Sequence, residues 1–326
     1  INLNREDMHS IMQTIMKGEA TPAQIGGLLV ALRIKGETVD EITAAAEVMR
    51  ELATKVDVDK TNLIDTCGTG GDSSNTFNIS TTSAFVVAAS GARVAKHGNR
   101  SVSSKSGSAD VLEAAGINIE LDAEEVASCI DNIGIGFMFA PMHHSAMKYA
   151  IGPRRELGLR TLFNVLGPLT NPASAPNQVI GVFEKKWLNP LAETLKQLGS
   201  KHILIVHSED GMDEISISAK TFIAELKDKE INNYEISPDD FDIKKFNIND
   251  LSVETIDESL TMMKSVLDNN DNAAKAIVSL NAGAAIYTSG IGDSIKTGVD
   301  MAKNIIESGA AKKKFEMLIQ HTQSFK

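Results

Sequence analysis

The sequence predicts an α/β protein with a small N-terminal part made only of helices and a larger part built on a mainly parallel central sheet. Two observations carry this prediction. The first 60 residues contain only segments with helical spacing, and from about residue 62 short apolar runs alternate with helical segments. Such alternation is typical of a parallel sheet with helices on its faces. With 326 residues, the chain is long enough for one large or two ordinary domains.

Three helices are predicted in the N-terminal part. Over residues 4–17, methionine and isoleucine recur at spacings of three and four. Thr21 followed by Pro22 marks the start of a second helix, and Thr38 with Glu41 forms a capping box in front of a third. The second helix, IGGLLVALRI, is apolar on nearly all sides. We therefore expect it to be buried on two faces, which suggests packing on another subunit.

Five short apolar runs are predicted to be buried strands. They are residues 62–65, 92–95, 135–140, 177–183 and 202–206. The helices predicted between and after them are residues 80–90, 108–116, 122–133, 188–199, 252–267, 273–287, 295–308 and 310–321. Residues 215–236 are predicted to form a short antiparallel excursion from the parallel sheet.

Composition narrows the classes of function. The net charge of −11 argues against a nucleic-acid-binding protein, which needs a basic face, and against binding to an anionic membrane surface. The N-terminus carries acids rather than a signal peptide, and no run reaches the roughly 18 apolar residues of a membrane span. Cys67 and Cys129 have no CxxC partner, so neither a disulfide framework nor a zinc site is indicated. We expect a cytoplasmic protein.

The stretch DTCGTGGDSSNTFNIST, residues 65–81, combines three glycines with many hydroxyl side chains. Gly68 and Gly70 fit the dinucleotide pattern GxGxxG, but Ser73 stands where its third glycine belongs. It is not a P-loop, because no Gly-Lys-Ser/Thr follows. Backbone N–H groups and hydroxyls at the start of a helix bind phosphate well. The stretch therefore predicts a phosphate site, with a plain structural turn as the alternative.

Two spans of the chain lack acidic residues and carry several cations. The first lies between Asp72 and Asp110, and the second runs from residue 132 to 155. They contain Arg93, Lys96, Arg100, Lys105, Lys148, Arg154 and Arg155. In an acidic chain these spans are where we expect a favourable potential for a highly charged anion. They follow predicted strands or helices, and ligands of open α/β sheets bind at strand ends.

Acidic residues follow the predicted strand at 202–206. Glu209, Asp210, Asp213 and Glu214 stand in the sequence SEDGMDE. Adjacent carboxylates at the end of a strand are one way in which proteins hold Mg²⁺ beside substrate phosphates. An ordinary exposed loop is the alternative, and the spacing does not match the type I phosphoribosyltransferase signature.

Five blocks of sequence carry a family resemblance. They are GTGGD (68–72), NIST (78–81), KHGNRSVSSKSGSADVLEAAG (96–116), APMHHSAMKYAIGPRRELGLRTLFNVLGPLTNPA (140–173) and DGMDEIS (210–216). Together with the helical start GEATPAQIGGLLVALRIKGET, they resemble the anthranilate phosphoribosyltransferase family over essentially the whole chain. That family joins anthranilate to phosphoribosyl pyrophosphate in tryptophan biosynthesis. One departure is Ser145, where the family often has proline after the paired histidines.

The resemblance implies a fold of the nucleoside phosphorylase and phosphoribosyltransferase type. Residues 1–62, joined by helices from about residues 155–175, would form a helical domain, and residues 63–326 an α/β domain that binds phosphoribosyl pyrophosphate. It also implies Mg²⁺ as cofactor, a homodimer formed through the helical domain, and an active site between the domains.

The matching motifs imply a set of site residues. Phosphoribosyl pyrophosphate would contact Gly68, Gly71, Asp72, Thr76, Asn78, Ile79, Ser80, Thr81, Lys96, His97, Gly98, Asn99, Arg100, Ser101, Val102, Ser103, Ser104 and Ser108. Asn99 and Arg154 would contact anthranilate, with Arg154 facing its carboxylate. Ser80, Asp213 and Glu214 would be metal ligands, and Lys96, Asn99 and Arg154 are the catalytic candidates.

The chemistry of the implied reaction agrees with these residue types. A glycosyl centre with a good leaving group reacts through an oxocarbenium-like state, so no covalent nucleophile is required. Positive charge on the departing pyrophosphate and placement of the amine are what the protein must supply. Because an aromatic amine is already neutral at pH 7, we expect His97, His143 and His144 to position groups rather than to act as bases.

Three rivals are weighed against this interpretation. Pyrimidine nucleoside phosphorylases carry a serine-threonine-glycine run after the lysine-histidine pair, where this chain has KHGNR. A non-catalytic relative that binds nucleic acid would show a basic groove and would have lost the Asp213-Glu214 pair. A dinucleotide-dependent oxidoreductase is disfavoured by the missing third glycine and by the other four blocks.

Overall fold

The computed structural model of the chain describes residues 1–72, 74–101, 106–244 and 246–325. Its helices are α1 (Arg5–Met16), α2 (Pro22–Lys35), α3 (Val39–Leu52), α4 (Ile79–Ala89), α5 (Ser108–Ala114), α6 (Ala123–Ile133), α7 (Ala140–His143), α8 (Lys148–Leu157), α9 (Leu162–Leu166), α10 (Leu188–Gln197), α11 (Ile256–Leu267), α12 (Ala273–Thr288), α13 (Ile295–Glu307) and α14 (Ala310–Gln323). The strands are β1 (Leu63–Gly68), β2 (Arg93–Gly98), β3 (Ile135–Phe139), β4 (Asn177–Gly181), β5 (His202–Ser208), β6 (Thr221–Lys227) and β7 (Glu230–Ile236). Short 3₁₀ turns are η1 (Ser145–Met147), η2 (Gly167–Leu169), η3 (Lys185–Trp187), η4 (Pro238–Phe241) and η5 (Ile248–Leu251).

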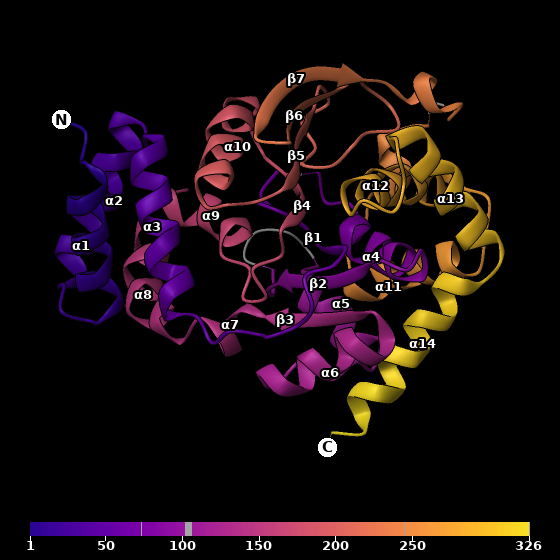
Figure 1. Cartoon of the computed structure of the whole chain (residues 1–326), viewed down its shortest axis with the longest axis horizontal. Helices are drawn as coiled ribbons and strands as arrows, with labels where there is room; N and C mark the ends of the chain where they lie inside the picture. The colour runs from indigo at the N-terminus through magenta and orange to yellow at the C-terminus, as the bar shows by residue number, and fades with distance from the viewer. Residues whose placement is uncertain (73, 102–105, 245, 326) are drawn as a thin grey trace.

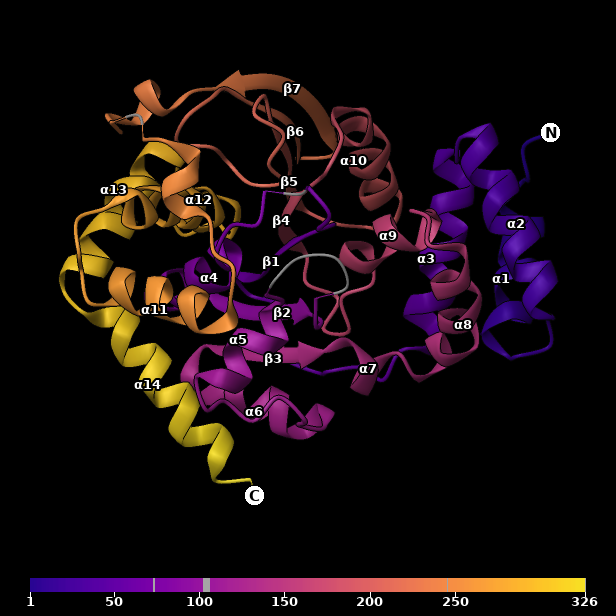
Figure 2. The same ribbon diagram turned by 180° about the vertical axis from the view of Figure 1, so that it is seen from behind.

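The α/β fold class predicted from the sequence is confirmed. A helical bundle at one end of the molecule packs beside a central sheet, and α11 to α14 lie at the opposite end (Figure 1 and Figure 2). The bundle helices begin where the sequence predicts, because Thr21 and Thr38 cap α2 and α3 with complete capping boxes. In the described part of the chain, no helix is both long enough and apolar enough to cross a bilayer.

The described part of the chain contains a sheet of seven strands in the order β3-β2-β1-β4-β5-β6-β7. The first five strands in this order, β3, β2, β1, β4 and β5, are parallel to one another. Strands β6 and β7 are antiparallel and form the excursion predicted for residues 215–236. The chain runs outward from β1 to β2 and β3, then returns to place β4 on the other side of β1. The carboxyl ends of β1 and β4 therefore form the switch point of the sheet, where open α/β folds bind their ligands.

At β5, two apolar clusters lie on the two faces of the sheet. Along β5 the side chains alternate, so Leu204 and Val206 join the cluster that contains α4 and α12 to α14. Ile203 and Ile205 join the cluster that contains α10, α8, α9 and the helical bundle. The bundle core is thus continuous with one face of the sheet. The division of the chain into domains at residue 62 stays a prediction.

Helix α2 is buried on one face only within the single chain, where two buried faces were expected. Ile25, Leu29 and Leu32 are buried, whereas the opposite side is exposed and carries Ile34, whose exposed fraction is 81%. The apolar character of the helix therefore exceeds what packing within one chain requires.

Candidate active site

The glycine loop leaves the sheet at the switch point. Gly68 ends β1 and pairs in register with Gly181, the last residue of β4. Gly70 and Gly71 have φ angles of 64° and 79°, a left-handed conformation that favours glycine. The loop then leads into α4, whose first turn carries Ile79, Ser80 and Thr81. The predicted phosphate loop therefore lies at the ligand-binding edge of the sheet, beside a helix N-terminus.

Asp213 lies directly against the ends of these two strands. Its Oδ2 accepts a hydrogen bond of 2.9 Å from the N–H of Gly70. A Cβ atom on Gly68 would stand 2.5 Å from that Oδ2, and one on Gly181 would stand 1.5 Å from the carbonyl oxygen of Asp213. Both glycines are therefore required by close approach. Gly181 was missed from the sequence, although a glycine inside an apolar strand is the signal that could have identified it.

Three carboxylates gather at this point. The N–H of Asp213 approaches Oδ2 of Asp72 at 3.4 Å, and Glu214 follows directly in sequence. Burial and the charge of Asp72 raise the pKa of Asp213 to about 7. Burial and the charge of Asp213 also raise the pKa of Glu214, which Lys96 partly offsets. The ionised forms of Asp213 and Glu214 are therefore disfavoured in the absence of a cation.

This donor set fits Mg²⁺. No cluster of three acidic, histidine or cysteine ligands is preassembled among the described residues. Mg²⁺ is, however, usually held by one or two carboxylates together with substrate phosphates rather than by a complete protein cage. The carboxylates of Asp213 and Glu214 are hard oxygen donors beside the glycine loop, and the hydroxyl of Ser80 lies on the adjacent helix turn.

Lys96 is a buried cation behind this edge. The side chain is 2% exposed, and its Nζ donates to the carbonyl oxygen of Thr66 and, over 3.3 Å, to Oγ of Ser80. Burial lowers the pKa of Lys96 and raises that of the fully buried Asp65, and each charge partly offsets the effect on the other. Asp65 is also held by the N–H of His97 at 3.1 Å. The strands β1 and β2 thereby fix an ammonium group at the start of α4.

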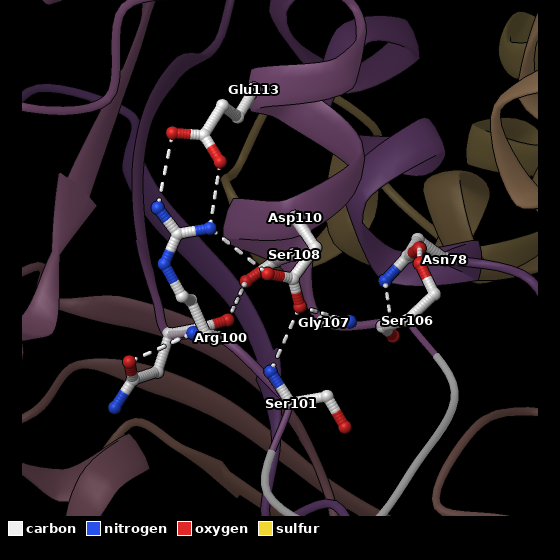
Figure 3. Close-up of polar contacts among 9 residues, drawn as sticks. Asn78, Arg100, Ser101, Ser106, Gly107, Ser108, Asp110 and Glu113 are labelled. Atoms are coloured by element: carbon white, nitrogen blue, oxygen red, sulfur yellow. Dashed lines mark hydrogen bonds and ion pairs between the residues drawn. The ribbon is translucent and has the colours of Figure 1, made fainter. Parts of the chain in front are cut away.

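The polar loop after β2 is held by Asn78, the N-cap of α4, and by Asp110 of α5 (Figure 3). Asn78 Oδ1 accepts hydrogen bonds of 2.8 Å from the hydroxyls of Ser106 and of Ser259, a residue of α11. Asp110 accepts 3.0 Å hydrogen bonds from the N–H groups of Ser101 and Gly107. Both ends of the loop are therefore fastened. The predicted contacts Val102, Ser103 and Ser104, and also Lys105, lie outside the described residues.

Other predicted site residues are also placed at this edge. Gly98 ends β2, and Ser108 begins α5 and donates to the carbonyl oxygen of Asn99 over 3.2 Å. Thr76 forms a β-bridge with Ser252 beside the glycine loop. The hydroxyl of Thr81 is buried and has no partner among the described residues.

Two cations of the first acid-free span are paired with acids from outside it. Arg93 pairs with Asp131 at 2.9 Å, and Arg100 pairs with Glu113 at 2.7 Å and with Asp110 at 3.1 Å. The guanidinium of Arg100 therefore points to α5 rather than into the site (Figure 3). These acids lie outside the span in sequence and reach it only through the tertiary fold.

Arg154 in the second span is different. It lies on α8, is half-buried, and its guanidinium lies over the ring of Phe163 at 5.0 Å. No described carboxylate forms an ion pair with it. A planar cation stacked on an aromatic ring remains able to accept a carboxylate in a bidentate fork.

Three histidines form a buried group beneath the loop. The rings of His97 and His144 are 5.1 Å apart, and Nδ1 of His143 lies 3.1 Å from the carbonyl oxygen of Thr54. Burial lowers the pKa of His97 to about 3 and that of His144 to about 4. All three pKa values lie below the ordinary histidine range, so these rings are neutral at pH 7. A positioning role is compatible with this state and stays a prediction.

We expect the variant His144→Asn to weaken the acid sensitivity of folding. The folded pKa of His144 lies below its unfolded value, so stability is complete above about pH 6.5 and is lost as the pH falls toward 4. Removing this group should reduce the slope of unfolding free energy between pH 4.5 and 6 by about 1.4 kcal/mol per pH unit. Urea unfolding at a series of pH values measures the slope, and an unchanged slope would contradict the prediction.

The chain matches two family models over most of its length. The model described as "Glycosyl transferase family, a/b domain" matches residues 60–312, and the one described as "Glycosyl transferase family, helical bundle domain" matches residues 1–53. The anthranilate phosphoribosyltransferases of Thioalkalivibrio sulfidiphilus and Marinomonas sp. are both 59% identical to the chain. They cover 99% of it and 96% and 94% of their own lengths.

Solved structures agree with these relatives. Anthranilate phosphoribosyltransferase from Thermus thermophilus superposes with a TM-score of 0.94 at 39% identity, covering 99% of this chain and 97% of that one. The Saccharomyces cerevisiae enzyme in complex with phosphoribosyl pyrophosphate and Mg superposes with a TM-score of 0.91 at 26% identity, covering 99% and 94%. The chain therefore belongs to the anthranilate phosphoribosyltransferases of the glycosyl transferase family.

Proposed function

We propose that the chain transfers the phosphoribosyl group of phosphoribosyl pyrophosphate to the amine of anthranilate, through a dissociative displacement at the anomeric carbon performed by the residues placed above. The products are N-(5-phosphoribosyl)anthranilate and pyrophosphate, in tryptophan biosynthesis. The observation that carries the assignment of the site is the meeting of the glycine loop, Lys96 and the Asp213-Glu214 pair at the switch point of the sheet.

Phosphoribosyl pyrophosphate would bind along the glycine loop and the start of α4. Because the N–H groups of Thr69 and Gly70 already donate to Gly181 and Asp213, the N–H groups of Gly71 and Asp72 would supply the backbone donors for its phosphates, together with the hydroxyls of Ser80 and Thr81. Lys96 adds positive charge behind them. Since the leaving pyrophosphate gains charge as the bond breaks, donors fixed in advance stabilise the transition state more than the bound substrate.

Asp213 and Glu214 would hold Mg²⁺, with Ser80 as the third predicted ligand. When bound, the ion would neutralise the pyrophosphate oxygens as a Lewis acid. Without a cation, these carboxylates would repel a polyanionic substrate, so their place beside the phosphate loop supports a metal site there.

Anthranilate would be oriented by Arg154. The guanidinium is stacked on Phe163 and would grip the anthranilate carboxylate, presenting the neutral amine to the anomeric carbon. Asn99, at the end of β2, would contact the same substrate. Placement of the amine is what converts a slow encounter between two substrates into an oriented reaction.

We expect Arg154→Lys to raise the KM for anthranilate by about 10- to 100-fold, because a charged hydrogen bond is worth about 1.5–3 kcal/mol. The KM for phosphoribosyl pyrophosphate should stay nearly unchanged. Steady-state rates measured while each substrate is varied separate the two values. The matched control is Arg155→Lys, at the next position and exposed. An equal rise in both KM values would count against the role of Arg154.

The reaction itself is tested by the loss of anthranilate fluorescence in a mixture of protein, phosphoribosyl pyrophosphate and Mg²⁺, with and without EDTA. A decay that stops on chelation supports both the reaction and the metal. If the folded protein binds phosphoribosyl pyrophosphate but produces no decay, the phosphate site is correct and the acceptor is wrong. A decay that EDTA does not affect rejects the metal role alone.

We also propose that the chain forms a homodimer through the helical bundle. Ala23, Gly27, Ala31 and Ile34 of α2 are exposed at spacings that place them on one face. The adjoining α8 exposes Ile151, at 46%. A second copy would give α2 the second buried face that its composition predicts. Sedimentation of Ile34→Glu should show monomers where the unaltered chain shows dimers, and monomers in both would reject the proposal.

A further inference from the structure

The turn between β5 and β6 carries Asp213 and Glu214, two neighbouring carboxylates whose like charges repel one another. With Asp72 close by, three carboxylates share one edge of the site: the N–H of Asp213 lies 3.4 Å from Oδ2 of Asp72, and Glu214 follows Asp213 directly in the chain. Mutual repulsion favours a turn that opens and separates them. Contacts from outside the three acids must therefore hold the turn closed before any cation arrives.

One such contact comes from Asp210, on the outer side of the turn. The hydroxyls of Ser216 and Ser218 each donate to its Oδ2 over 2.6 Å, and the hydroxyl of Ser208 donates to Oδ1. Ser208 ends β5, whereas Ser216 and Ser218 lie beyond Glu214. A single carboxylate thus joins the two ends of the segment that contains the acidic pair. A carboxylate accepts several hydrogen bonds, which makes it suited to this role.

The second contact comes from Asn281, on the inner side. This residue lies in the middle of α12 and is 4% exposed. Its Oδ1 accepts from the N–H of Ile215 over 2.9 Å, and its Nδ2 donates to the carbonyl oxygen of Ile215 over 2.9 Å and to that of Ile277 over 2.9 Å. Ile215 directly follows Glu214 in the chain. The side-chain amide of Asn281 therefore ties the backbone next to the acidic pair to helix α12 through two hydrogen bonds.

We infer that Asp210 and Asn281 are positioning residues that clamp the turn from its two sides and so keep Asp213 and Glu214 together in a geometry ready for Mg²⁺. The inference rests on the proposed role of those two carboxylates in holding the ion. Residues that hold metal ligands in place without touching the ion commonly have a strong effect on metal affinity. Neither residue is among those placed at the substrates.

The sequence holds a signal for each clamp residue. Asp210 stands in DGMDEIS, but its carboxylate could not be distinguished there from an exposed loop acid. Asn281 is a polar residue inside the apolar helix AAKAIVSLNAGAAIY, where a buried amide needs hydrogen-bond partners. Only the fold shows that its partner is the metal turn.

The test compares Asp210→Ala with Glu209→Ala. Both variants remove one exposed carboxylate from neighbouring positions, so they change the charge near the site equally. Only the first removes the hydrogen bonds to the three serines. Because Asp210 is exposed, its loss should leave the protein folded, whereas Asn281→Ala serves as the stronger, buried second variant.

The readout is binding of Mn²⁺ in the presence of phosphoribosyl pyrophosphate, followed by electron paramagnetic resonance, together with the Mg²⁺ concentration for half-maximal rate. Asp210→Ala should weaken Mn²⁺ binding and raise the half-maximal Mg²⁺ concentration by about tenfold. The rate should recover at saturating Mg²⁺, and the KM for anthranilate should stay within about twofold of the unaltered value. Recovery with excess ion is an effect that general damage to the fold would not produce.

Two results would overturn the clamp. One is an Asp210→Ala variant whose Mn²⁺ affinity equals that of Glu209→Ala. The other is a rise in the KM for anthranilate as large as the loss of Mn²⁺ affinity. The unaltered chain separates this failure from that of the proposed function. If it binds Mn²⁺ with phosphoribosyl pyrophosphate, only the clamp is rejected. If it binds no Mn²⁺, the metal role and the clamp are rejected together.

Discussion

Replacing Lys96 by methionine should lower kcat by about 10³-fold, the scale on which loss of one fixed donor to a developing anion is felt. Lys96 is 2% exposed and lies behind the start of α4, with its Nζ on the carbonyl oxygen of Thr66 and the hydroxyl of Ser80. The variant keeps the shape of the side chain and removes its charge. The rate of a single turnover at saturating phosphoribosyl pyrophosphate and Mg²⁺ measures the effect.

The same change should destabilise the fold, which requires a control. Asp65 is fully buried, and Lys96 is the cation that offsets its charge. Removing one partner of a buried pair costs about 3–5 kcal/mol, whereas removing both is often nearly neutral. The double variant Asp65→Asn/Lys96→Met should therefore recover stability in urea unfolding without recovering the rate.

A surface lysine separates the role of Lys96 from a general effect of charge. Lys186 is exposed beside Glu184, so Lys186→Met should retain the full rate. A folded Lys96→Met protein whose rate lies within about tenfold of the unaltered chain would reject a catalytic role for this lysine.

The second large effect is expected from Gly181→Ala. The added Cβ would stand 1.5 Å from the carbonyl oxygen of Asp213 and 2.4 Å from its carbonyl carbon, so the turn must move away from the strand. Displacing a binding group by about 1 Å typically costs about 10²-fold, and we expect at least this loss in kcat/KM for phosphoribosyl pyrophosphate. Overpacking should also cost about 1–3 kcal/mol of stability.

The matched control for Gly181→Ala is Gly26→Ala. A Cβ at Gly26, inside α2, would meet no atom within 4 Å, and helical backbone suits alanine well. We expect this control to retain both rate and stability, as measured by steady-state kinetics and urea unfolding. If Gly181→Ala keeps the rate and stability of the control, the close contact of Asp213 with β4 is not required for activity.

Local signals in the sequence were sufficient for most elements. The caps at Thr21 and Thr38 act within one turn of the chain, so their effect can be read without knowing the fold. The same holds for the short apolar runs that became β1 to β5 and for the antiparallel hairpin of β6 and β7. The glycine loop and the acidic pair were also identifiable, because their residue types have few other uses in combination.

The charge of the site could not be deduced in this way. The sequence shows Arg100 in a span without acids, but the fold brings Asp110 and Glu113 to its guanidinium. A span that lacks acids in sequence can therefore be neutral in space. Arg154 remained without a described carboxylate partner because the helices around it present Phe163 instead.

By itself, the sequence determined most of the segments that become helices and strands, and which family of motifs the chain carries, because these depend on contacts between residues close in the chain. The tertiary structure alone decided how β1 and β4 meet, why Gly181 must lack a side chain, and how Asn281 reaches the turn after β5. Each of these depends on atoms that are distant in sequence and come within a few ångströms only when the sheet and its helices pack. The physical reason is that packing and electrostatics act through space, whereas periodicity and capping act along the chain.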